Sequence, residues 1–326
     1  MYTIHYTRWS YIFLFITTFL LLLLFGFNYL VDPYGNKELV CKNIYKPILN
    51  ERAKKYNYIF NENNIEKYDS VILGSSRVMQ IIPSHISEGK FYNFGVHIAN
   101  NAEKLFLLQE WLKIKPLKKV YLGIDFYNFH KDKKPLSDNS YKFQEQYTHN
   151  YLSIETFKLS LKSLKYQVQN KPQTFFEDSG EINYFHKDRL IQENLFDFSD
   201  AKYETEAEQN FIHDYSSFKT DARVYDILKQ IHTLSVKHHF ELYIFFTPSH
   251  ISHINLIQNN PIISQQFHEI KTEVKYIFGI IHDFSSDEAS NRNSQYFYDI
   301  FHYRSSLGDE IIKTLQNNGA YGAILK

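Results

Sequence analysis

The sequence predicts an α/β fold, with a five-stranded parallel sheet that follows a single transmembrane helix. Two observations predict it: an uncharged apolar stretch lies near the N-terminus, and short apolar runs recur along the rest of the chain. Most of these runs are separated by segments in which apolar residues have helical spacing. Strands that alternate with helices in this way are typical of a parallel sheet with helical crossovers.

The transmembrane helix is predicted from residues 9–31, none of which is charged. At about 1.5 Å per residue, a helix of this length crosses a hydrocarbon core of roughly 30 Å. The stretch ends in Asn28-Tyr29-Leu30-Val31-Asp32-Pro33, which lacks the small residues of a signal-peptide cleavage site. We therefore expect a short tail at residues 1–8 and an uncleaved anchor in membrane lipid. Basic residues on both sides leave its orientation undecided: Arg8, Lys37, Lys42 and Lys46.

A polar lead-in at residues 32–67, with a predicted turn at Asp32-Pro33-Tyr34-Gly35, connects the anchor to a domain at residues 68–326. Five apolar runs predict the strands of this domain, at residues 70–75, 91–96, 119–125, 241–247 and 280–284. Apolar residues with helical spacing predict crossover helices at residues 101–114, 224–234 and 261–278.

The last helix has its own start and stop signals. Ser306 and Asp309 form a candidate capping pair, and Asn317-Asn318-Gly319 is a candidate stop. Between them Ile311, Ile312 and Leu315 are expected to face the sheet.

An insertion at about residues 127–205 separates the third and fourth strands and is expected to be helical. Within it Ile154, Phe157, Leu161, Leu164 and Val168 are spaced by three and four residues, which predicts an amphipathic helix. Lysines 158, 162 and 165 lie off this stripe and give the helix a basic face. The helix either packs on the domain with its lysines in water or contacts an anionic membrane surface or glycan.

Composition excludes several classes of function. The chain has 36 Lys+Arg against 36 Asp+Glu, which argues against a nucleic-acid-binding protein. Cys41 is the single cysteine, so neither an intrachain disulfide nor an all-cysteine metal site can form. His238-His239 and the pair His250 and His253 lack further ligands at metal-binding spacing, and Gly74 stands without the other glycines of a phosphate-binding loop. We expect no metal and no cofactor.

Polar residues follow the predicted strands at the sheet edge where doubly wound folds bind ligands. The first strand leads into Gly74-Ser75-Ser76-Arg77, where we expect a hydroxyl at a helix N-terminus whose N–H groups favour negative charge. The second and third strands end in Asn93-Phe94-Gly95 and Gly123-Ile124-Asp125. The fifth is followed by Tyr298-Asp299-Ile300-Phe301-His302, just before the last helix.

These blocks contain the parts of a serine nucleophile system. A serine hydroxyl needs a base within hydrogen-bond reach, and that base needs a third group to orient it. Asp299 and His302, three residues apart on a turn, can supply both.

The ordered blocks resemble the SGNH (GDSL-like) hydrolase superfamily over about residues 68–315. The anchor, the Asp-Pro-Tyr-Gly segment and the Gly-Ser-Ser-Arg block look most like its membrane-anchored branch in bacterial envelope polymer modification. That branch includes the teichoic-acid D-alanyl transfer protein and the alginate O-acetylation proteins. The resemblance implies a flavodoxin-like sheet, with Ser76 as nucleophile, His302 as base and Asp299 as its orienting group. Gly95 and the Ser76 backbone are the implied oxyanion donors.

Two positions depart from the family pattern. The third block of the family usually supplies an asparagine as oxyanion donor, but the residue here is Asp125, whose negative charge would repel an oxyanion. Either Asp125 is protonated, or Asn128 or Asn100 donates instead, or catalysis is impaired. Arg77 follows the serine directly and either holds an anionic group of the substrate or is a helix-start arginine in solvent or in an ion pair. Ser249, after the fourth strand, is a further candidate for lining the site.

The sequence therefore predicts an enzyme of the bacterial cytoplasmic membrane whose extracytoplasmic domain acylates or deacylates an envelope polysaccharide. Its partners would be the glycan, an acyl donor and a membrane acyltransferase. The alternative is a catalytically silent protein of the same fold that assists a membrane acyltransferase or a glycan exporter.

Overall fold

The computed structural model describes residues 2–34, 51–131, 150–168, 176–182, 185–316 and 319–325. It divides into two compact units, which we describe separately. The first unit comprises Met1–Leu49, Gln146–Phe175 and Asn183–Asp188, and the second comprises Asn50–Glu145, Phe176–Ile182 and Arg189–Lys326. The predicted turn residue Gly35, the lysines at positions 37, 42 and 46, Cys41, and the stop residues Asn317 and Asn318 lie outside the described residues.

The first unit contains α1 (Tyr2–Val31) and α5 (Ile154–Val168). Within α1, the segment Thr7–Val31 is long and apolar enough to cross a membrane. Helix α1 ends at a turn that includes Pro33 and Tyr34, as predicted. Helix α5 has the bounds that the leucine and isoleucine spacing predicts, and it packs against the C-terminal part of α1.

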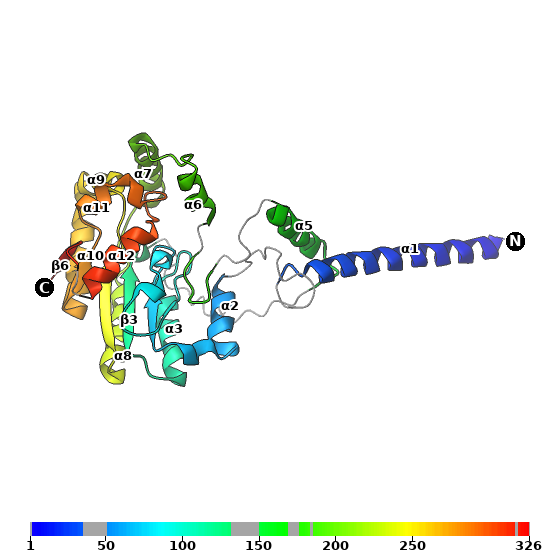
Figure 1. The fold of residues 1–326 in the computed structure, drawn as a ribbon, viewed down its shortest axis with the longest axis horizontal. Coiled ribbons are helices and arrows are strands. Elements are labelled where there is room, and N and C mark those ends of the chain that lie inside the picture. Colours follow the sequence, from blue (N-terminus) through cyan, green and yellow to red (C-terminus); the bar gives the residue numbers. More distant parts are fainter. Residues whose placement is uncertain are drawn as a thin grey trace. The chain divides into compact units, whose positions relative to one another are not determined.

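The second unit is built on a six-stranded mixed sheet (Figure 1). Its strands are β1 (Ser70–Leu73), β2 (Phe91–Asn93), β3 (Lys119–Ile124), β4 (Glu241–Phe246), β5 (Ile281–Asp283) and β6 (Ala323–Leu325). The spatial order is β2-β1-β3-β4-β5-β6, and the first five strands all pair in parallel. These five lie within the predicted ranges, so the α/β class is confirmed.

The prediction of a five-stranded, all-parallel, flavodoxin-like sheet is wrong. Strand β6 pairs antiparallel with β5, with Leu325 opposite Ile281 and Ala323 opposite Asp283. A Cβ on Gly322 would lie 2.5 Å from Phe284, and the φ of this glycine is +78°, so the chain enters β6 through a conformation that favours glycine. A run of three apolar residues is too short to show a strand period, which is why the sequence did not reveal this strand.

The helices of the second unit include all three that the spacing predicts. They are α2 (Glu51–Tyr56), α3 (Asn101–Ile114), α7 (Asp200–Asp214), α8 (Arg223–His238), α9 (Ile251–Gln258), α10 (Pro261–Phe278), α11 (Ala289–Arg292) and α12 (Ser305–Leu315), while α6 (Phe185–Gln192) crosses the boundary between the units. The short helices are η1 (Asn57–Asn61), η2 (Asn64–Lys67), η3 (Val78–Gln80), η4 (Pro83–His85), η5 (Phe126–Phe129) and η6 (Ser294–Tyr296). Helices α5 and α6 and the start of α7 lie within the predicted insertion between β3 and β4.

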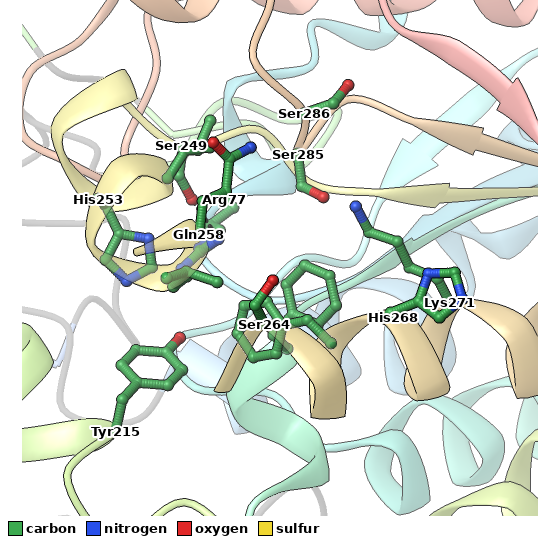
Figure 2. A pocket seen from close by; sticks show the side chains of 14 residues that line it. Arg77, Tyr215, Ser249, His253, Gln258, Ser264, His268, Lys271, Ser285 and Ser286 are labelled. Carbon is green, nitrogen blue, oxygen red and sulfur yellow. Dashed lines mark hydrogen bonds between the residues drawn. The ribbon is translucent and has the colours of Figure 1, made fainter. Parts of the chain in front are cut away.

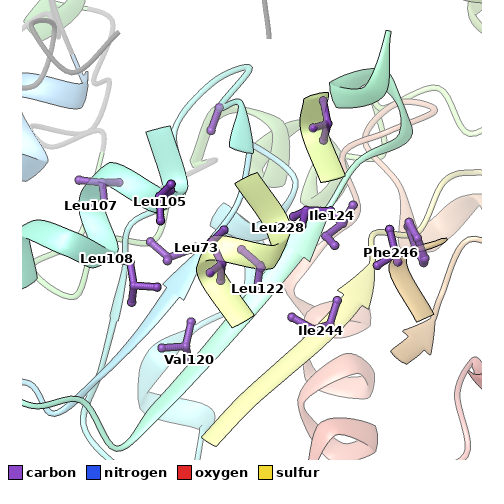
Figure 3. Close-up of a cluster of buried hydrophobic side chains, with 14 of the residues drawn as sticks. Leu73, Leu105, Leu107, Leu108, Val120, Leu122, Ile124, Leu228, Ile244 and Phe246 are labelled. Atoms are coloured by element: carbon purple, nitrogen blue, oxygen red, sulfur yellow. The ribbon is translucent and has the colours of Figure 1, made fainter. Parts of the chain in front are cut away.

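Both faces of the sheet are buried, and the alternation of side chains along each strand separates them. Val71 and Leu73 of β1 point into a cluster with the leucines of α3 and with Leu228 of α8 (Figure 3). Ile72, between them, points to the opposite face and into a second cluster with Leu307 and Ile311 of α12. Each such side chain contributes roughly 1.5–3 kcal/mol when it is fully buried. The sheet is therefore held rigid from both sides, and so are the loops at its carboxyl edge.

The predicted start of the last helix is wrong in detail. Helix α12 begins at Ser305, the N-cap residue is Arg304, and no side chain caps the helix. Asp309 instead lies 2.7 Å from Nδ1 of His85. The burial of Ile311, Ile312 and Leu315 is confirmed.

Candidate active site

Three glycines at the ends of β1, β2 and β3 pack around one side chain, that of Val78. A Cβ on Gly74, Gly95 or Gly123 would lie 2.5, 2.8 or 2.4 Å from a Val78 methyl group. Contacts this short do not occur, and Val78 is fully buried with no room to move, so the three positions need glycine. Because Val78 follows Ser76 closely in the chain, this packing gathers the three predicted blocks around the serine.

The segment after Ser76 is not the regular helix that the sequence predicts. The three-residue 3-10 helix η3 follows the serine, and the chain is extended again at Ile81 and Ile82. Pro83 explains the interruption, because a residue that precedes proline is disfavoured in the helical region. A single short turn carries little dipole, so electrostatic stabilisation by a helix N-terminus is a wrong expectation at this position.

Asp299 and His302 lie on a tight turn between β5 and α12. The turn is closed by an antiparallel bridge between Phe297 and Tyr303 and by the Tyr298 N–H, which donates to the His302 carbonyl at 2.8 Å. The Asp299 carboxylate also accepts the backbone N–H groups of Phe301 (3.0 Å) and His302 (2.8 Å). Contacts within the turn therefore hold the carboxylate next to the imidazole.

The turn places both residues against Ser76. Nε2 of His302 lies 2.9 Å from Oγ of Ser76, and Nδ1 of His302 lies 2.8 and 3.0 Å from the two carboxylate oxygens of Asp299. An ionised carboxylate cannot donate, so Nδ1 carries the proton and Nε2 accepts from the serine hydroxyl. The sequence-predicted residues Ser76, His302 and Asp299 thus form one hydrogen-bonded chain, which we call the triad.

The two neighbouring serines have different surroundings. Ser75 is buried, and its hydroxyl accepts the backbone N–H of Arg77 at 3.2 Å. Ser76 is the serine that faces His302. In the triad the side chains of His302 and Asp299 are 23% and 26% exposed, whereas Ser76 is buried at 8%.

Arg77 points away from the triad into a buried cluster. Its Nε lies 3.4 Å from Oδ1 of Asp125, and its Nη1 donates to the hydroxyls of Thr247 and Ser249, each at 3.2 Å. Thr247 donates in turn to Asp125 at 2.5 Å. The guanidinium also lies 4.2 Å from the ring centroid of Phe301. We call Arg77, Asp125 and Thr247 the Arg77 cluster; in it the charge of Asp125 is compensated by a cation.

The predicted oxyanion donors differ in whether they already form a hydrogen bond within the chain. The Gly95 N–H donates to Oδ1 of Asn93 at 2.9 Å, so it is paired within its own loop. Asn100 forms a capping box with Glu103 at the start of α3. Asn128 is buried, and its Nδ2 has no hydrogen-bond partner in the described part of the chain. Of these candidates, Asn128 is the one with a donor to spare.

Two buried lysines that the sequence did not point to hold the loops of the site. Nζ of Lys55 donates to the carbonyls of Asn93, Gly95 and Gly180 at 3.0, 2.6 and 2.6 Å, and Nζ of Lys104 donates to the Gly123 carbonyl at 2.9 Å. Burial lowers the pKa of Lys55 to about 7 and that of Lys104 to about 8. Lys104 precedes Leu108 by one helical turn, so its position on the buried face of α3 could have been noticed. Lys55 lies in a polar stretch without any such pattern.

A cavity of about 210 Å³ lies beside Arg77 at the carboxyl edge of the sheet (Figure 2). Hydroxyl groups of Ser249, Ser264 and Ser285 and the amine of Lys271 line it (Figure 2). His253 is buried in its wall, and neither ring nitrogen has a hydrogen-bond partner among the described residues. Burial lowers the pKa of His253 to about 3, so this imidazole is neutral at pH 7.

No set of three or more His, Cys, Asp or Glu side chains suited to a metal occurs in the part of the chain that the structure describes. His250 bonds to Ser252 and Ser294, which accounts for one histidine of the pair that the sequence singled out. Comparisons with protein-family models and with curated proteins gave no match to this chain.

Proposed function

We propose that this protein is a membrane-anchored serine acyltransferase or acylesterase that acts through an acyl-Ser76 intermediate. The observation that carries the proposal is the continuous hydrogen-bonded chain from Ser76 through His302 to Asp299. Its three members come from two loops separated by most of the domain, yet they meet with the geometry that nucleophilic catalysis requires.

The chemistry follows from the positions of the protons. As Oγ of Ser76 attacks an ester carbonyl, Nε2 of His302 takes the hydroxyl proton, and the Asp299 carboxylate stabilises the imidazolium that forms. When the tetrahedral intermediate collapses, His302 returns this proton to the leaving oxygen. A water molecule or a sugar hydroxyl then gives a proton to His302 and attacks the acyl-serine, which releases the acid or the acylated sugar and restores the serine.

Resemblance adds the substrate class to the proposal. The blocks that resemble the SGNH hydrolase superfamily lie at the ends of β1, β2 and β3 and before α12, and the glycines in them share the contact with Val78. Membership in the envelope-modifying branch would make the substrate an O-acylated polysaccharide.

Asp125 fits this proposal because its charge is not left free. The Arg77 guanidinium and the Thr247 hydroxyl compensate the carboxylate, so it need not repel an oxyanion at Ser76. We propose the free amide of Asn128 as the side-chain oxyanion donor and the Ser76 N–H as the backbone donor.

Labelling with a fluorophosphonate tests the nucleophile directly. The full chain in detergent should be labelled, and so should Ser75→Ala, which removes the neighbouring hydroxyl. Ser76→Ala should not be labelled. Equal labelling of Ser76→Ala and the wild type would exclude Ser76 as the nucleophile.

Residues 9–31 would place this enzyme in the bacterial cytoplasmic membrane with its domain outside the cytoplasm. A reporter enzyme that is active only outside the cytoplasm, fused to the C-terminus, tests this topology. Activity of a cytoplasm-specific reporter at the same position would contradict it.

A second candidate is a catalytically silent protein that assists a membrane acyltransferase or glycan exporter. Two observations favour it: the Gly95 N–H is already paired with Asn93, and Asp125 occupies the position of an asparagine donor. In that case neither labelling nor ester hydrolysis by the wild type should exceed that of Ser76→Ala.

A further inference from the structure

Helix α5 is buried through its polar side and exposed through its apolar side. Thr156, Ser160 and Ser163 are fully buried, and they lie on one face because they are spaced by four and three residues. Three of the five residues of the apolar ridge have the opposite exposure: Ile154 is 63%, Leu161 47% and Val168 83% exposed, while Phe157 and Leu164 are partly buried. A helix on a water-soluble surface has the reverse arrangement.

The buried face of α5 contacts α1. Oγ of Ser160 donates to Oδ1 of Asn28 at 3.0 Å, and Nδ2 of Asn28 donates to the carbonyl of Tyr151 at 2.8 Å. The rings of Phe27 and Phe157 lie 5.2 Å apart. Small side chains that allow close approach, with a hydrogen bond between the helices, are typical of helix pairs in membranes.

These contacts fix where α5 lies along the apolar helix. They involve the last turns of the segment Thr7–Val31, which is long and apolar enough to cross a membrane. At the same end, the ring centroids of Tyr29 and Tyr34 each lie 5.9 Å from that of Tyr151. Clusters of tyrosine are typical of the boundary between lipid and water. Asp32, which accepts the Tyr151 hydroxyl at 2.9 Å, marks the polar side of this boundary.

Length and charge determine how α5 meets the bilayer. Its 15 residues span about 22 Å at 1.5 Å each, which is too short to cross the hydrocarbon core. Lys158, Lys162 and Lys165 are exposed and adjoin the apolar ridge, where long basic side chains can reach phosphate groups.

We propose that α5 lies in the membrane interface, with Ile154, Leu161 and Val168 in the acyl-chain region and its lysines at anionic lipid headgroups. The hydrogen bond from Ser160 to Asn28 joins α5 to the apolar helix within the first unit. This inference does not depend on the proposed enzymatic function.

Spin labelling in lipid nanodiscs tests the proposal on the full chain. Cys41→Ser removes the single cysteine, and Leu161→Cys, Val168→Cys or, as a matched control, Val236→Cys on α8 receives a nitroxide. Val236 is 61% exposed, so the three sites start from comparable accessibility. We expect collisions with oxygen to exceed collisions with a water-soluble nickel complex at positions 161 and 168, and the reverse at position 236.

Two results would overturn the proposal. Nickel accessibility at positions 161 and 168 equal to that at 236 would place α5 in water, and low accessibility to both reagents would show that another protein covers the ridge.

The lysines are tested separately in phosphatidylcholine discs with and without phosphatidylglycerol. The anionic lipid should deepen the label at position 161, and the combined changes Lys158→Gln, Lys162→Gln and Lys165→Gln should abolish this deepening. Equal depth in both lipids would overturn the headgroup contact.

Discussion

The triad and the Arg77 cluster contain neighbouring residues of the chain, yet their side chains differ in how far they are exposed to solvent. Ser76 and Arg77 are consecutive, and so are Phe301, which contacts Arg77, and His302. Two triad side chains, those of His302 and Asp299, are about one quarter exposed, whereas the Arg77 and Asp125 side chains are 6% and 0% exposed. Under the proposed function the partly exposed set would exchange protons with a substrate, while the buried set holds charges in place. The turns at Ser76-Arg77 and Phe301-His302 thus direct neighbouring side chains into two different environments.

The largest expected effect is the loss of the triad nucleophile. Ser76→Ala should lower the hydrolysis of p-nitrophenyl acetate by on the order of 10⁵-fold, because the members of such a triad act as a unit. Ser75→Ala is the control and should retain most of the activity. Similar losses in the two variants would show that the reaction does not distinguish the two serines.

Removing the charge that orients His302 should have the next largest effect. Asp299→Asn should lower turnover roughly 10⁴-fold, because an amide does not hold the imidazole in the required tautomer. Asp309→Asn is the matched control. The Asp309 carboxylate lies 2.7 Å from Nδ1 of His85, away from the triad, so its removal should leave turnover unchanged. Wild-type turnover in Asp299→Asn would refute the assigned role.

A substitution in the Arg77 cluster should lower the stability of the folded protein. Arg77→Met leaves the carboxylate of Asp125 buried without its cation, which should lower the free energy of unfolding by about 3–5 kcal/mol. Urea unfolding of the full chain in detergent measures this change. Lys229→Met, which breaks a pair with Asp226 whose side chains are 59% and 74% exposed, should barely move the unfolding midpoint. An unaltered midpoint in Arg77→Met would contradict the supporting role of the cluster.

The smallest effect concerns His253, in the cavity wall next to Arg77. The unfolded chain binds a proton at this imidazole below about pH 6.5, whereas burial lowers the folded-state pKa to about 3. Stability is therefore fully present above pH 6.5 and is lost as the pH falls from there toward 3. Between pH 7 and 5 the loss from this group should reach about 2 kcal/mol.

His253→Leu should lose correspondingly less stability over this pH range than the wild type. The exposed His239 provides the control, and His239→Asn should follow the wild-type curve. Identical pH dependence of His253→Leu and the wild type would show that this group does not titrate as its burial requires.

The residues of the triad could be predicted from the sequence because each of them depends on short-range patterns. Ser76 follows an apolar run and a glycine, and Asp299 and His302 occupy one turn whose own backbone N–H groups bind the carboxylate. The partners of Arg77 could not be predicted, since Thr247 and Ser249 lie about half the chain away and nothing in their local pattern indicates a contact.

Helix α5 also shows a limit of prediction from sequence. The spacing of its apolar residues predicted the helix and both of its ends, but spacing alone identifies an apolar face without saying what covers it. In α10 the apolar face, with Phe267 and Ile270, is buried in the core. In α5 three residues of the apolar face are exposed, and the small polar face is buried and donates a hydrogen bond to α1.

The sequence by itself determined the α/β class, five of the six strands and the apolar helix, because local periodicity encodes them, and the order of its short motifs singled out Ser76, Asp299 and His302 as candidates. The tertiary structure brought Ser76 within hydrogen-bond distance of His302 and decided how the charge of Asp125 is compensated and which face of α5 is covered. It also added β6, whose three residues become a strand only by pairing with β5. These features depend on contacts between distant segments, and such contacts exist only once the chain has folded.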